Sequence, residues 1–114
     1  MTRSSEFVAF VLESLQPLRG VSARRMFGGF GIYKDGVMFA LIAHETLYFK
    51  IDDGNRAAYE DAGLPHFTYV DKGKPILMPY REAPPEGFDD PDILCAWARE
   101  AYAAALRAKK SKRK

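Results

Sequence analysis

Two histidines and one cysteine offer the widest catalytic and metal-binding chemistry of the side chains in this chain. His44 and His66 fall at predicted turn or loop positions, and Cys95 falls early in the last predicted helix. A zinc site needs three or four ligands, commonly at short spacings. A third ligand would have to come from a carboxylate such as Glu45 or Asp61, and these have no recognisable ligand spacing. We therefore interpret the histidines as surface residues and predict no metal site.

A cysteine near the start of a helix can be reactive, because the positive end of the helix dipole lowers the pKa of a thiol. No histidine stands at a motif spacing from Cys95, so an inert, partly buried thiol is the favoured interpretation. Three carboxylates, Asp89, Asp90 and Asp92, precede or begin the same helix, where they are well explained as helix caps. These residues predict a protein without catalytic residues, and an enzyme is the less favoured alternative.

A glycine-rich apolar run at residues 26–33, Met-Phe-Gly-Gly-Phe-Gly-Ile-Tyr, has the composition of a phosphate-binding loop. Such a loop needs a glycine turn between a strand and a helix, so that backbone amides and the helix N-terminus point at the anion. The run is instead followed by Asp35-Gly36, which favours a two-residue hairpin turn. We predict a first strand that is kinked at its glycines, and no nucleotide or other cofactor.

Helical and strand patterns alternate along the chain in the order α-β-β-β-α-β-β-α. Amphipathic spacing and terminating residues predict helices over residues 6–15 and 55–62 and a third helix from Asp90 onward. Alternating apolar residues and turn signals predict strands over residues 21–33, 37–43, 46–51, 67–70 and 75–80. This order predicts an α+β fold, an antiparallel five-stranded sheet with helices packed on one face.

The second strand, residues 37–43, is apolar on both faces. By alternation, one face carries Val37, Phe39 and Leu41, and the other carries Met38, Ala40 and Ile42. Helices on one side of the sheet leave the second set uncovered, and an exposed apolar sheet face commonly marks a partner surface. We predict a homodimer or another protein partner on this face, with coverage by a loop as the alternative. The candidate partner surface is Met38, Ala40, Ile42 and Tyr48.

Basic residues gather at the C-terminal end of the chain. Lys109, Lys110, Lys112, Arg113 and Lys114 supply five of the 17 Lys and Arg residues. Without them, 12 basic residues remain against 15 acidic ones, a formal charge of −3. We predict a single domain over residues 1–107 and a basic flexible tail over residues 108–114. The tail is a candidate nucleic-acid contact, and the alternative is a solvated, frayed terminus.

Arg24 and Arg25 stand side by side just before the glycine-rich run. If the strand alternates, one of the two points away from the core and can bind an acidic group. We count both as candidate anion or nucleic-acid contacts. The alternative is a solvated strand end with local carboxylate pairs.

Bulk properties narrow the class of protein. A chain of 114 residues suits one domain, and its single cysteine excludes an internal disulfide framework, which suits a reducing compartment. The longest fully apolar run, residues 37–43, is far shorter than the roughly 20 residues that span a bilayer. We expect a cytoplasmic protein without a membrane segment.

Residues 25–33, together with Gly36, Phe39 and Leu41, resemble the N-terminal domain of the TfoX/Sxy competence regulators. The resemblance extends over about residues 5–105 and implies a bacterial protein with a secretion-chaperone-like fold. The full-length regulators promote natural transformation genes through protein contacts with the transcription machinery. The implied function is a small non-enzymatic protein-interaction module. A nucleic-acid-associated protein acting through the Lys/Arg tail is the alternative, and an uncharacterised enzyme is a weaker one.

Overall fold

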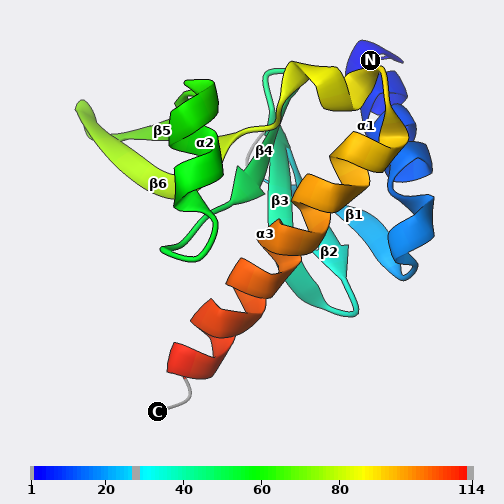
Figure 1. The fold of residues 1–114 in the computed structure, drawn as a ribbon. Helices are drawn as coiled ribbons and strands as arrows, with labels where there is room; N and C mark the ends of the chain where they lie inside the picture. Colours follow the sequence, from blue (N-terminus) through cyan, green and yellow to red (C-terminus); the bar gives the residue numbers. More distant parts are fainter. Residues whose placement is uncertain (1, 27–28, 113–114) are drawn as a thin grey trace.

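The computed structural model describes residues 2–26 and 29–112, and the side chains at 2–5, 69, 71, 111 and 112 lie outside this description. Its helices are α1 (Thr2–Ser14), α2 (Arg56–Ala62) and α3 (Pro91–Lys112), with short 3-10 helices η1 (Gln16–Leu18) and η2 (Pro85–Phe88). Its strands are β1 (Val21–Met26), β2 (Gly29–Lys34), β3 (Val37–Ala43), β4 (Thr46–Lys50), β5 (His66–Asp71) and β6 (Lys74–Glu82) (Figure 1). The predicted α+β class with an antiparallel sheet is confirmed, with six strands in place of five.

The sheet has the strand order β1-β2-β3-β4-β6-β5, and every neighbouring pair is antiparallel. The prediction of one kinked strand over residues 21–33 is wrong, because β1 and β2 pair with each other from Val21–Lys34 to Met26–Gly29. Gly29 instead marks a close approach between strands. A Cβ atom there would collide with the carbonyl oxygen of Ile42 on β3. Glycine is therefore required by strand packing rather than by a bend.

The turns that the sequence predicts are present. Asp35 and Gly36 have φ of 50° and 83°, and Lys72 and Gly73 have φ of 52° and 80°. Two successive positive φ values are typical of the tight turns that join antiparallel strands. At the start of α3, the backbone amide of Asp92 donates to Oδ1 of Asp90 at 3.0 Å. The local chemistry of these turns and of this cap therefore sets where the elements begin and end.

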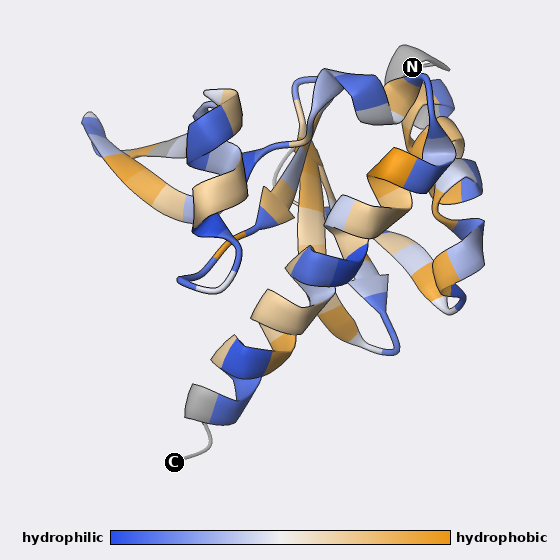
Figure 2. Cartoon of the chain, viewed as in Figure 1, coloured by the Kyte–Doolittle hydropathy of each residue, from blue (hydrophilic) through white to orange (hydrophobic). Residues whose placement is uncertain are grey.

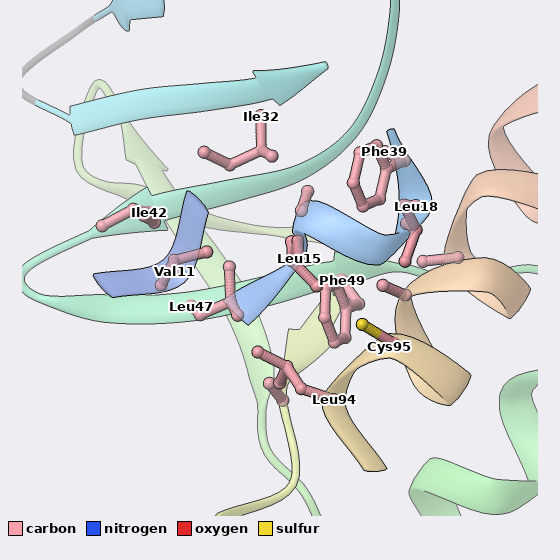
Figure 3. Packing of buried hydrophobic residues seen from close by; sticks show 14 of the residues in the cluster. Val11, Leu15, Leu18, Ile32, Phe39, Ile42, Leu47, Phe49, Leu94 and Cys95 are labelled. Atoms are coloured by element: carbon pink, nitrogen blue, oxygen red, sulfur yellow. The ribbon is translucent and has the colours of Figure 1, made fainter. Parts of the chain in front are cut away.

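The helices α1 and α3 cover one face of the sheet and bury the hydrophobic core. In Figure 1, α3 crosses the front of the sheet and α1 lies at its upper right. Figure 3 shows Val11 of α1 and Leu15, which follows α1, packed among sheet side chains and Leu94 of α3. Phe39 of β3 stacks against Phe49 of β4, with ring centroids 6.4 Å apart. We call this the helix-covered face, and the opposite side of the sheet the open face.

A β-bulge in β3 breaks the alternation of its side chains. The bulge leaves one extra residue, Phe39, between the pairs Ile32–Ala40 and Tyr33–Met38. As a result Phe39, Ala40 and Ile42 all belong to the core and are at most 3% exposed. The prediction that Ala40 and Ile42 share an uncovered face with Met38 is therefore wrong, because an extra residue reverses the alternation beyond it.

The β5–β6 hairpin extends past the helix layer, with α2 beside it (Figure 1). Its base is held by Arg81, whose buried Nε donates to the carbonyl oxygen of Leu64 at 2.8 Å. Toward its tip, Val70 and Leu77 are each 63% exposed, and the apolar part of β6 is visible in Figure 2. This hairpin therefore carries exposed apolar side chains outside the core.

Candidate functional site

A hydrophobic groove of about 510 Å³ lies on the open face. It is lined by Met26, Gly29, Phe30, Met38, Leu41, Ile42, Phe67, Met78 and Tyr80. These residues come from β1, β2 and β3 on one side and from the β5–β6 hairpin on the other. A concave apolar surface of this size is typical of ligand and peptide sites. We call it the methionine groove.

Three of the four methionines of the chain line this groove. Two of them are brought together by Gly31, which opposes Leu41 in the middle of the sheet. A Cβ atom on Gly31 would lie 2.8 Å from the sulfur of Met26 and 3.2 Å from the sulfur of Met38. The bare backbone at Gly31 therefore lets the two thioethers lie over the sheet. Methionine side chains are flexible and polarisable, and they adapt to partners of different shape.

Aromatic side chains extend the groove toward the hairpin. The rings of Tyr48 on β4 and Phe67 on β5 have centroids 4.8 Å apart. Tyr80 is only 8% exposed, and burial raises its pKa to about 12. Burial, followed by the nearby charge of Glu82, raises the pKa of Tyr48 as well. These tyrosines are therefore partly dehydrated in the free protein and stay neutral at physiological pH.

Arg24 flanks the methionine groove at its β1–β2 side. Its guanidinium lies 5.3 Å from the ring centroid of Tyr33, which approaches Gly31 together with the sulfurs of Met26 and Met38. Arg25, the next residue along β1, points to the helix-covered face, where its guanidinium lies 5.4 Å from the ring centroid of Phe30. Both arginines are exposed, and the ion pairs of the described residues include neither. Among the described side chains neither arginine pairs with a carboxylate, and the choice between an anion contact and a solvated strand end stays a prediction.

A second, smaller depression adjoins the groove and is also basic. It has a volume of about 320 Å³ and shares Met38 and Tyr80 with the groove. Lys50 and Lys109 contribute to its lining, and Nζ of Lys50 lies 5.3 Å from the ring centroid of Tyr80. Exposed basic side chains, Arg24 and Lys109, thus stand at two separate edges of the methionine groove.

The predicted tail is partly helical. Helix α3 continues to Lys112, so Lys109 and Lys110 stand exposed on its last turns. The side chain of Lys112 and the whole of Arg113 and Lys114 lie outside the described residues. The predicted domain boundary at residue 107 stays a prediction, and the helix carries Lys109 to the edge of the smaller depression.

The residues with catalytic chemistry lie on separate elements. His44 is exposed in the turn between β3 and β4, and His66 begins the edge strand β5. Cys95 is 3% exposed, its thiol donates to the carbonyl oxygen of Ser14 at 3.2 Å, and burial raises its pKa (Figure 3). Within residues 2–26 and 29–112, no three His, Cys, Asp or Glu side chains come together as metal ligands. In the same ranges, no helix combines the length and hydrophobicity of a membrane span.

Of the predicted partner surface, Met38 lines the methionine groove. Tyr48 lies beside the groove, with its ring tilted against that of Phe67. Ala40 is fully buried, and Ile42 contributes to the lining while only 3% exposed. Sequence reasoning did not assign the other lining residues to this surface: Met26, Gly29, Phe30, Leu41, Phe67, Met78 and Tyr80. One available signal was the spacing of Met78 and Tyr80, two residues apart in a strand, which places both side chains on one face.

The fold and this groove define a small α+β protein with one helix-covered and one open sheet face. Comparison with known families matches residues 13–105 to the TfoX N-terminal domain. The chain therefore belongs to the TfoX N-terminal domain family, as the glycine-aromatic run predicts, and it is a competence-regulator-like module. No curated protein matches the chain by sequence.

Proposed function

We propose that this protein is a non-enzymatic protein-interaction module that binds its partner in the methionine groove. The observation that carries the proposal is the apolar, methionine-lined surface on the open face, where no helix of the described residues packs. An apolar groove lined by methionine and aromatic side chains is typical of surfaces that bind partners of different shape. Family membership supports a regulatory role linked to competence.

Site-directed photo-crosslinking in the cells that make the protein tests this proposal. A benzophenone amino acid replaces Leu41 in the groove, and a matched control replaces Leu77, which is exposed on the hairpin and outside the groove. We expect a discrete protein adduct from position 41 that is lost when Met78→Asp is added. Equal adducts from both positions, or none from position 41, would contradict the proposal.

A second copy of the chain is one form that this partner can take. Its crosslinked adduct has twice the mass of the chain, so the same experiment identifies it. Sedimentation of the purified protein at micromolar concentration gives an independent readout, because Leu41→Asp should shift a groove-mediated dimer to monomer. A strict monomer in the unmodified protein argues against a homodimer and leaves binding of another protein intact.

The alternative function, nucleic-acid binding, is favoured by the exposed lysines on the last turns of α3. Such binding should weaken steeply with salt, because neutralising phosphates releases counterions. Truncation after Arg107 removes these lysines. Unchanged DNA affinity of the truncated chain would exclude this role for the end of α3.

A further inference from the structure

We propose that the methionine groove selects an acidic protein segment that anchors through apolar side chains. This inference rests on the proposed function of the groove as a protein-binding site and adds the chemistry of the partner. The observation that carries this inference is the position of exposed basic side chains at two edges of the apolar methionine groove.

The first edge is formed by Arg24 of β1. Arg24 lies over Tyr33, whose ring approaches Gly31 beside the sulfurs of Met26 and Met38, whereas the neighbouring Arg25 lies over Phe30 on the helix-covered face. Stacking on aromatic rings orients a guanidinium while leaving its N–H groups available. A carboxylate at this edge can therefore form bidentate hydrogen bonds with an arginine that is already positioned.

The second edge lies where the groove meets the end of α3. Met38 and Tyr80 line both the groove and the smaller depression, so a chain lying in the groove reaches Lys109 without leaving the surface. Glu82 pairs with Tyr48 across β4 and β6, and it places one negative charge on the open face. Arg24 and Lys109 stand exposed at the two edges of the groove, and their charges favour an anionic ligand there.

The lining between these edges excludes a purely electrostatic ligand. Leu41, Phe67 and the three methionines offer dispersion contacts and few hydrogen bonds, so a phosphate backbone would bury its charge against apolar atoms there. Apolar side chains of a peptide fit this lining, and acidic side chains beside them fit the edges. The combination matches an acidic segment interrupted by apolar residues.

The exposed hairpin of a second copy is a poorer match. Its apolar Val70 and Leu77 lie near Lys72 of the turn and Lys74, the first residue of β6, and all four are exposed. Placing these lysines against Arg24 opposes like charges, which disfavours a contact. Charge complementarity therefore favours a different protein chain as the occupant.

Fluorescence anisotropy with two synthetic peptides tests the inference. Both peptides carry the same leucine and phenylalanine residues, and the remaining positions are glutamate in one and lysine in the other. We expect the acidic peptide to bind at least about tenfold more tightly, with the difference shrinking as salt screens the charges. Arg24→Glu should reduce this preference, and the matched Arg25→Glu on the opposite face of β1 should leave it unchanged. Met78→Asp and Leu41→Asp should abolish binding, and Leu77→Asp should not change it.

The outcomes separate this inference from the proposed function. Equal binding of both peptides, lost in Leu41→Asp, would overturn the acidic preference and leave the groove as a protein-binding site. Acidic-peptide binding that survives both groove variants, or no binding of the acidic peptide at all, would overturn the inference. Tighter binding of a short duplex DNA that displaces the acidic peptide would overturn it in favour of nucleic acid. Circular dichroism of each variant separates lost binding from lost folding.

Discussion

The helix-covered and open faces of the sheet differ in the side chains that they carry. On the helix-covered face, Phe39, Leu47 and Phe49 are at most 1% exposed and pack in fixed contacts with the helices. On the open face, Met38 and Leu41 remain half-buried in a groove. Strand β3 supplies apolar side chains to both faces, and its bulge sets which of them face the core. The comparison shows that the apolar side chains of β3 stabilise the fold on one face, while those on the other face remain accessible to a binding partner.

The strongest test of this comparison uses two neighbouring residues of β3. Phe39→Ala should lower the free energy of unfolding by about 3–5 kcal/mol, because it opens a cavity under α3. Leu41→Ala should cost only about 1 kcal/mol, because its side chain is partly solvated in the unbound protein. Urea unfolding of the two variants measures both values. Similar losses of unfolding free energy in the two variants would contradict the distinction between the two faces.

The two described glycines of β2 give the next largest contrast. Gly29→Ala should destabilise the protein by about 1–3 kcal/mol, because the new methyl group meets the backbone of β3, which cannot move without parting the strands. Gly31→Ala meets the flexible ends of Met26 and Met38 instead. We expect it to change unfolding by less than about 1 kcal/mol and to weaken groove binding. Thermal unfolding and the peptide assay together test this; a reversed order of stabilities would contradict it.

A charged contact on the helix side has a smaller expected effect. Arg107 of α3 donates to Asp52 from Nε at 2.6 Å and from Nη2 at 2.8 Å, and this hydrogen bonding lowers the pKa of Asp52. Because the folded pKa lies below the unfolded value of about 3.9, the stabilisation is present above that pH and is lost as the pH falls through the folded pKa. Asp52→Asn should cost at most about 1 kcal/mol at pH 7, since solvent screens the pair.

Urea unfolding of the wild type and Asp52→Asn between pH 7 and pH 2 measures this contribution. The two stabilities should converge as the pH falls below about 4. A difference that stays constant with pH would show that the asparagine acts through packing and not through charge.

The smallest effect is expected at Tyr59, a buried residue of α2 whose ring packs edge-on against Trp97 of α3. Its hydroxyl is buried and has no hydrogen-bond partner among the described residues. Tyr59→Phe removes this unpaired group and keeps the ring, so it should be neutral or should stabilise by up to about 1 kcal/mol. Chemical denaturation measures the change. A clear loss of stability would show that the hydroxyl is bonded in solution.

Short-range patterns predicted the parts of the fold that depend on neighbouring residues. The turns at Asp35-Gly36 and Lys72-Gly73 and the cap at Asp90 follow from local backbone and side-chain chemistry, and all three are present. The division of residues 21–33 into two strands was missed, because Gly29 is explained by a contact with Ile42 on another strand. The candidate site was half predicted, since Met38 and Tyr48 lie at the groove while Ala40 lies in the core.

Local sequence patterns were enough to predict the family, the α+β class and a strand that is apolar on both faces. Periodicity, turn residues and the glycine-aromatic run are properties of adjacent positions, so they are visible in the amino-acid sequence. Which apolar side chains stay accessible follows from the tertiary structure. That choice depends on the bulge at Phe39 and on the gathering of Met26, Met38 and Met78 from three strands. Both arise from pairing between distant segments, which the order of residues along one strand does not encode.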